Sequence, residues 1–424
     1  MFYKLHQLNF MNFLNFKNLK TYFFLFVIPL LFSACESDID IKKEAEPIRL
    51  KVGMEKRVAQ DNEFAWDLFK QVLDNTKEAN TFISPLSVSI ALGMTWNGAD
   101  GKTKSEMEST LKMSGMSEKE INEYYQIMQN SLVKIDPSTK LNIANSIWYK
   151  EGYPIYKSFL DVNKEYFNAE VSALDFSNPK SLDIINNWCS EKTNGLIKDP
   201  LDRIPADAIM YLINAIYFKG IWSSEFKEND TSEKDFVSSS GKTNKVDMMQ
   251  QEQTFNYFED DKAQYLDMPY GNKAFSMTVI LPKQKNTIES YLKDFDMDEW
   301  NRIVENLSPR EVKVYFPKFK VQSKLELQDV LSIMGMPLAF DTEADFSRMS
   351  EGDLLISRII HSTYCDVNEK GTEAAAVTVV EVGVTSMPLE NPVFNANRPF
   401  IFIIREKSTG VILFMGKMGE VEKY

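Results

Sequence analysis

Hydrophobic positions follow a helical period in some parts of the chain and a strand period in others. From Met54 onward, apolar residues recur every three or four positions, which predicts an amphipathic helix. Ser84 followed by Pro85 has the chemistry of a helix N-cap and first turn, so a second helix should begin there. A strand is predicted at 141–149, and a further helix around 182–189. These elements indicate a mixed α+β protein.

The stretch 369–387 has the hydrophobic pattern of a buried strand, but the glycine and proline residues in and after it are typical of an exposed loop. Read with period 2, one face begins with small residues and ends with β-branched ones, as in a strand packed on a core. Yet Gly371 opens the stretch and three prolines follow it by Pro399. Two interpretations remain open: a core strand, or a loop that can become a strand. The face in question consists of Thr372, Ala374, Ala376, Thr378, Val380, Val382 and Val384.

The first 34 residues have the pattern of a cleaved leader. Basic residues precede an apolar run at 21–32 that is too short to span a membrane comfortably. Residues 31–35 resemble a bacterial lipobox, so we expect lipidation of Cys35, with plain secretion as the alternative. Either way the protein is expected to be extracytoplasmic. A lipidated Cys35 would anchor it to a bacterial membrane, at the outer membrane or cell surface, with 35–50 as an acidic tether.

The charge of the chain argues against two classes of partner. The formal net charge is −13, and removing residues 1–34 takes away three lysines and no acidic residue. An acidic mature chain does not bind nucleic acid or anionic lipid through charge. No repeat or Gly/Ser-rich linker follows residue 50, so a single domain over 51–424 is predicted.

Few residues are suited to metal binding or to nucleophilic catalysis. Once Cys35 is set aside, Cys189 and Cys365 are too few for a disulfide framework and are expected to be buried thiols. His361 is the one histidine after the leader, which gives a metal site no support. A hydrolase would have to use it as base, and there is no Gly-x-Ser-x-Gly motif. We therefore expect no metal, no cofactor and no enzyme activity, although a pair of glycosidase carboxylates is neither supported nor excluded.

Residues 368–376, Asn-Glu-Lys-Gly-Thr-Glu-Ala-Ala-Ala, resemble the reactive-loop hinge of the serpins. Further matches cover roughly 54–417 and lie at 80–92, 212–222, 246–249, 268–282, 315–319, 344–347 and 397–402. The resemblance implies the α+β serpin fold: a large mixed central sheet, two smaller sheets, about nine helices and an exposed reactive loop near 369–392.

The resemblance also assigns three groups of residues. The hinge, where the loop leaves the sheet, would comprise Glu369, Gly371, Thr372, Ala374, Ala375, Ala376 and Thr378. The shutter cluster, expected to be a buried hydrogen-bonded group beneath the central strands, would comprise Ser84, Ser87, Asn214 and His361. The breach, where insertion begins, would comprise Trp222, Lys318 and Glu369, with the last two close together.

A serpin of this kind would be a monomeric inhibitor that traps its protease as a covalent acyl-enzyme while the cut loop inserts into the sheet. The family spacing places the scissile bond between Thr385 and Ser386, with Val384 and Met387 as alternatives in register. No Lys or Arg lies between Gly371 and Asn397, which disfavours trypsin-like targets. We expect serine proteases of the elastase or chymotrypsin type, and papain-like cysteine proteases as a second class.

The alternative is a non-inhibitory serpin, acting as a surface binding or chaperone-like lipoprotein. Such members usually carry bulky or charged hinge residues, whereas this chain has Ala374, Ala375 and Ala376. Val377 is larger than the residue usual in the family and would slow insertion.

Overall fold

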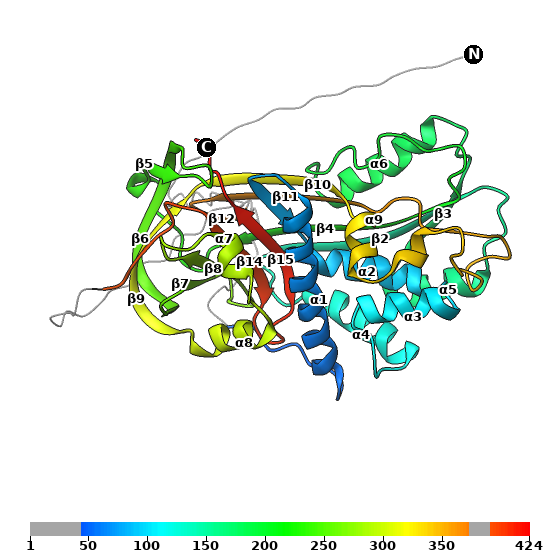
Figure 1. Ribbon diagram of the computed structural model, residues 1–424, viewed down its shortest axis with the longest axis horizontal. Helices are drawn as coiled ribbons and strands as arrows, with labels where there is room; N and C mark the ends of the chain where they lie inside the picture. The colour runs from blue at the N-terminus through cyan, green and yellow to red at the C-terminus, as the bar shows by residue number, and fades with distance from the viewer. Residues whose placement is uncertain (1–43, 373–390) are drawn as a thin grey trace, which may run out of the picture. The chain divides into compact units, whose positions relative to one another are not determined.

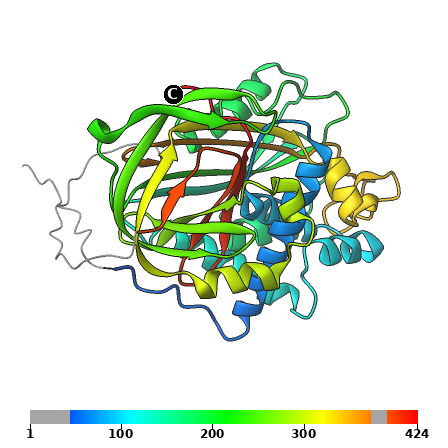
Figure 2. The same cartoon turned by 60° about the vertical axis from the view of Figure 1, so that its left-hand side comes forward.

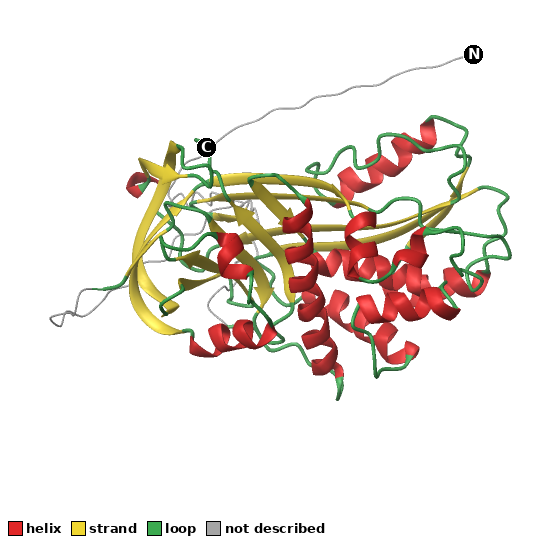
Figure 3. Ribbon diagram, viewed as in Figure 1, coloured by secondary structure: helices red, strands yellow, loops and turns green. Residues whose placement is uncertain are grey.

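The computed structural model describes residues 44–372 and 391–424, which contain nine α-helices (Figure 3). The predicted helices at Met54 and Pro85 are both present. The helices are α1 (Met54–Asn75), α2 (Pro85–Trp96), α3 (Gly101–Thr110), α4 (Glu118–Leu132), α5 (Lys157–Phe167), α6 (Lys180–Lys192), α7 (Ile288–Leu292), α8 (Met297–Asn306) and α9 (Gln328–Met334). No helix in these residues is long and apolar enough to cross a membrane.

The central sheet has six strands in the order β10-β11-β12-β4-β2-β3, and they run lengthwise through the molecule (Figure 1). Neighbouring strands are antiparallel except β2 and β3, which are parallel, so the sheet is mixed as expected. Its strands are β2 (Lys140–Lys150), β3 (Glu170–Leu174), β4 (Met210–Ile221), β10 (Phe319–Glu326), β11 (Ile360–Asn368) and β12 (Gly371–Thr372).

The other strands form one connected sheet, where the resemblance implied two smaller ones. The 17-residue strand β6 joins them, because it pairs with β5 at one end, with β7 at the other and with β9 along most of its length. Figure 2 shows the C-terminal strands, in red, enclosed by the green and yellow strands of this sheet. The strands are β1 (Asn80–Ile83), β5 (Ser232–Val237), β6 (Thr243–Glu259), β7 (Ala263–Pro269), β8 (Phe275–Pro282), β9 (Ser308–Pro317), β13 (Val393–Asn395), β14 (Phe400–Glu406) and β15 (Ile412–Met418).

Aromatic side chains fill the space between the two sheets. Phe82 stacks on Phe402 and Phe414, with ring centroids 5.5 and 5.3 Å apart. Phe218 of β4 meets Phe414 and Phe275 edge to face, which joins the central sheet to this group. Aromatic pairs of this kind stabilise a core beyond the area that they bury. The core therefore fixes β4 against β8 and β15.

The local signals at helix ends act as the sequence predicts. The Ser84 hydroxyl accepts a hydrogen bond from the Ser87 N–H at 3.3 Å, and Pro85 occupies the first position of α2. Helix α6 is followed by Asn194 and Gly195, both with positive φ, which is a left-handed stop. Cys189 and Cys365 are free and buried.

Residues 44–50, placed by the sequence in the tether, pack against the domain. The Ala45 N–H donates to the Asn272 carbonyl at 3.1 Å, and Glu44 pairs with Lys273 at 2.8 Å. Ile48 and Leu50 are half-buried against the core. The end of the predicted tether is therefore held by the fold; the leader, Cys35 and residues up to 43 lie outside the described part of the chain.

Candidate functional site: a strand gap with a gate at each end

The central sheet is divided between β4 and β11. In the described part of the chain these two strands do not pair with each other, and the two-residue strand β12 lies between them at one end. On one side Gly371 and Thr372 pair with Ile221 and Gly220, and on the other β12 pairs with the end of β11. Gly371 and Thr372, within the stretch 369–387 that the sequence left open between strand and loop, are thus already strand.

Gly371 cannot be replaced without moving the backbone. Its φ is +147°, and a Cβ atom built on it would lie 2.1 Å from the Gly220 carbonyl oxygen. Only glycine avoids both the strained φ and this contact. The next residue, Thr372, is buried and shares a hydrogen bond of 2.7 Å with the Tyr270 hydroxyl. The start of the hinge is thereby fixed in register.

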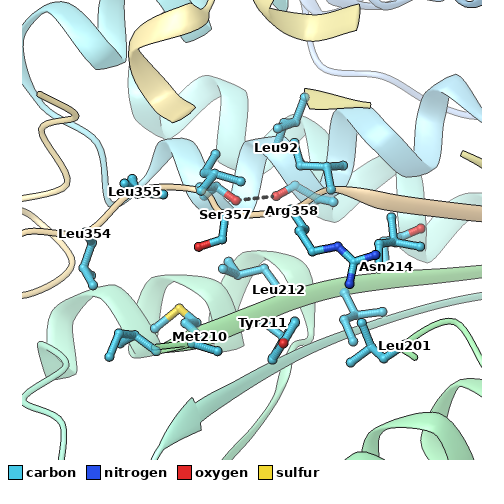
Figure 4. A pocket seen from close by; sticks show the side chains of 18 of the residues that line it. Leu92, Leu201, Met210, Tyr211, Leu212, Asn214, Leu354, Leu355, Ser357 and Arg358 are labelled. Carbon is cyan, nitrogen blue, oxygen red and sulfur yellow. Dashed lines mark hydrogen bonds between the residues drawn. The ribbon is translucent and has the colours of Figure 1, made fainter. Parts of the chain in front are cut away.

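A cavity of about 500 Å³ occupies the opposite end of the gap. It is lined by residues 210–214 where β4 begins, by 353–361 leading into β11, and by the face of α2. Figure 4 shows apolar side chains gathered around it, among them Leu92, Met210, Leu212 and Leu354. The gap therefore has β12 at one end and an apolar cavity at the other.

The four residues of the predicted shutter cluster are brought together at the edge of this cavity. The Ser84 N–H donates to His361 Nε2 at 2.9 Å, and the Ser84 hydroxyl donates to the Leu413 carbonyl at 2.7 Å. The Ser87 hydroxyl donates to Asn214 Oδ1, and its N–H reaches Ser84 Oγ. The cluster therefore ties α2 to both β4 and β11.

Two further members of this network were missed by the sequence analysis. The Asn214 amide donates to Asn145 Oδ1 at 2.7 Å, and the Asn145 amide donates to Gln129 Oε1 at 2.6 Å. Asn145 was visible as a polar residue in the predicted strand 141–149. Its partner could not be found, because the pairing of Asn145 with Asn214 depends on the register of β2 and β4.

His361 is held in its neutral form. Its side chain is buried, and this burial lowers the pKa of the imidazole from 6.5 to about 4. Nε2 accepts the Ser84 N–H, so that nitrogen carries no proton. Protonation would place two N–H groups against each other and would charge a buried ring.

The breach lies at the β12 end of the gap. Trp222 stacks on Tyr270 with centroids 4.5 Å apart, and its indole N–H donates to the Asn368 carbonyl at 3.0 Å. Lys318 Nζ lies 3.1 Å from Glu369 Oε2, so the expected contact is present. The Thr231 hydroxyl, which the sequence analysis did not single out, donates to the other Glu369 oxygen at 2.8 Å.

Hydrogen bonds keep Glu369 ionised although it is buried. Burial by itself would raise the pKa of this carboxyl, but hydrogen bonds from its own backbone, from Thr231 and from Lys318 leave the pKa below the usual value. The breach therefore depends on charge, whereas the shutter cluster depends on a neutral imidazole.

The remaining predicted site residues lie outside the described part of the chain. These are the hinge residues Ala374, Ala375, Ala376 and Thr378, and the reactive-bond residues Val384, Thr385, Ser386 and Met387. The chain is described again from Asn391, whose amide donates to Glu252 at 2.9 Å before β13 pairs with β9. Within the described residues, no group of His, Cys, Asp or Glu side chains could hold a metal ion.

Comparisons with known proteins agree with this geometry. The family model Serpin (serine protease inhibitor) matches residues 59–421. A serpin-like protein of Methanosarcina acetivorans is 36% identical over 370 residues, which cover 85% of this chain and 87% of that protein. The leukocyte elastase inhibitor of Bos taurus is 35% identical over 379 residues, covering 86% and 99%. The crystal structure of the thermophilic serpin tengpin in the native state has a TM-score of 0.79 at 34% identity, covering 90% of this chain and 98% of that one.

The neutral His361 predicts a loss of stability in mild acid. The unfolded chain takes up a proton near pH 6.5 whereas the folded protein does so near pH 4, so stability falls as the pH drops between these values. Between pH 7.5 and pH 5 this should amount to about 2 kcal/mol. Urea unfolding of the intact protein and of His361→Ala at both pH values measures it. Equal pH dependence in the two proteins would contradict the prediction.

Removing the imidazole should also weaken the closure of the sheet. In His361→Ala the Ser84 N–H loses its acceptor, and α2 is no longer tied to β11. We expect this variant to form polymers or an inactive inserted monomer on warming, as seen by native electrophoresis. Ser362→Ala, which removes a buried hydroxyl without a hydrogen-bond partner, is the matched control and should remain an intact monomer.

Proposed function

The chain belongs to the serpin family, and we propose that it inhibits elastase-type serine proteases by inserting its own cleaved loop into the central sheet. The observation that carries this proposal is the gap between β4 and β11. Its first two positions are filled by Gly371 and Thr372, and its far end is an apolar cavity. Because the two strands do not pair with each other in the described residues, insertion need not first break a ladder between them.

The register of β12 defines where the rest of the loop would go. The pairing is antiparallel, so each step of one residue forward along the loop would move the partner one residue back along β4 and along β11. Thr378 would then lie between Asn214 and His361, at the shutter cluster. Its small polar side chain suits a site whose neighbours are hydrogen-bonding groups.

Two valines would follow into the cavity. Continuing the same register, Val380 would lie between Leu212 and Ile359, and Val382 between Met210 and Ser357. All four of these neighbours line the cavity. Burying a valine side chain stabilises by about 1.5–3 kcal/mol. The small-then-branched order of this face therefore matches the order of sites along the gap.

The loop sequence and the relatives support the proposed target class. A trypsin-like pocket contains a buried acid that would remain unpaired, since no Lys or Arg lies between Gly371 and Asn397. Thr385 and its apolar neighbours suit a small primary pocket of the elastase type, and Val384 suits papain-like cysteine proteases. The leukocyte elastase inhibitor of Bos taurus is 35% identical to this chain. Lipidation at Cys35 would place this inhibitor on the outside of a bacterial membrane.

Mixing the protein with elastase should give complexes that survive SDS, because the protease stays covalently attached. Chymotrypsin and papain are the next candidates, and trypsin should not form complexes. Mass spectrometry of the released C-terminal peptide should place the cut between Thr385 and Ser386. A cut outside Val382 to Met387, or complexes with trypsin alone, would show that the assignment is wrong.

A charge at the shutter position separates inhibition from simple cleavage. Thr378→Arg would bring an unpaired guanidinium between Asn214 and His361, so this variant should be cut without forming stable complexes. Thr378→Ser keeps the hydroxyl and should inhibit like the original protein. Complexes of equal yield from both variants would exclude insertion in this register.

Cleavage should raise the melting temperature of the protein by tens of degrees, because the cut loop fills the gap and its cavity. Circular dichroism melting of the intact and the cut protein measures this. A cut loop in an ordinary protein gives no such gain. A cleaved form that melts at or below the intact one would identify a substrate or a non-inhibitory serpin, acting as a surface binding or chaperone-like protein.

A further inference from the structure

Tyr424 packs against the breach although it lies far from it in the sequence. Its ring centroid is 4.3 Å from the Nζ atoms of both Lys318 and Lys320. Its hydroxyl donates to Asp366 Oδ1 on β11 at 2.6 Å. Figure 1 shows this end of the chain near β5, at the same end of the molecule as β12.

The residues before Tyr424 hold it in this place. The Tyr424 N–H donates to Asp247 Oδ2 at 3.2 Å, and Asp247 is also the residue whose carbonyl accepts the Lys318 N–H at 2.9 Å. Lys423 pairs with Glu233 at 2.7 Å, and Val421 is buried. The position of the ring is therefore defined by the hydrogen bonds of the Tyr424 N–H and hydroxyl and by the contacts of the residues before it.

Tyr424 can restrict the position of the Lys318 side chain. Its ammonium group lies over the Tyr424 ring and 3.1 Å from Glu369. A lysine side chain loses conformational freedom when it forms an ion pair, which is why such pairs at a surface contribute little. A ring face on one side of the ammonium attracts the cation and restricts its positions, so less freedom remains to be lost. Lys320 pairs with the other oxygen of Asp366, at 3.5 Å, which orients the acceptor of the tyrosine hydroxyl.

We infer that Tyr424 is a positioning residue for the breach: it holds Lys318 against Glu369 and so slows insertion of the uncut loop. The inference rests on the proposed insertion function and adds a control on its rate. Tyr424 is 42% exposed, so its removal leaves no large hole in the core. The expected consequence is a change in the rate of insertion, with little change in the fold.

The test measures insertion without any protease, in the full chain. The intact protein is incubated at elevated temperature, and its conversion to an inserted monomer is followed by resistance to urea on native gels. Tyr424→Ala should convert about tenfold faster, because both the ring and its hydrogen bond are lost. Tyr424→Phe keeps the ring over Lys318 and should convert no more than about threefold faster. Lys157→Ala, the control, removes an exposed ion pair with Asp161 on α5 and should change the rate less than about twofold.

A double variant distinguishes positioning from a separate structural role. If Tyr424 acts through the Lys318–Glu369 pair, Tyr424→Ala should add less than about twofold to the rate of Glu369→Gln. An unchanged rate in Tyr424→Ala, or the same tenfold increase in both backgrounds, would overturn the inference. Failure of the proposed function itself looks different, because then the original protein shows no urea-resistant form after either cleavage or warming.

Discussion

The separation of β4 from β11 is the constraint on which the rest of this structure depends. A sheet interior normally satisfies its backbone groups by pairing neighbouring strands. Here the described part of the central sheet places two residues of β12 between these strands and an apolar cavity at the other end. If the loop inserts as proposed, the intact fold has to keep β4 and β11 apart and still exclude further residues of the loop. The aromatic core beneath β4 and the polar network on α2 both serve this requirement.

The shutter cluster and the breach, at the two ends of the gap, depend on different kinds of interaction. At the shutter cluster, the neutral and buried His361 accepts the Ser84 N–H. The stability that this arrangement contributes falls as the pH drops below about 6.5. At the breach, an ionised carboxylate meets an ammonium group, and the lowered pKa of Glu369 keeps this pair intact until the pH falls further. The shutter cluster can therefore be weakened while the ion pair of the breach remains intact. Acid should loosen the cavity end first.

The hinge illustrates how little freedom the start of the loop retains. Gly371 is set by a close backbone approach, and Thr372 by its bond to Tyr270. Backbone N–H groups of Trp222 and Phe226 hold the carbonyls of Lys370 and Glu369 at 2.9 Å. These contacts define the register at Gly371 and Thr372. If the loop inserts as proposed, the same register would bring its small residues to the polar network and its valines to the cavity.

Much of this could be predicted from the sequence, because the signals are local. Short segments of the sequence are enough to predict the cap at Ser84 and the strand at 141–149. They also show the glycine at 371 and the lack of a basic residue in the loop. The resemblance to a known family added the expectation that Ser84, Asn214 and His361 meet. The tertiary structure alone decided which strands pair in which register, and hence that Asn145 and Gln129 complete the network and that β6 joins two expected sheets into one. It also decided that Tyr424 lies over Lys318. Such contacts join residues that are far apart in the chain, and no local period encodes them, because they depend on how the whole core closes.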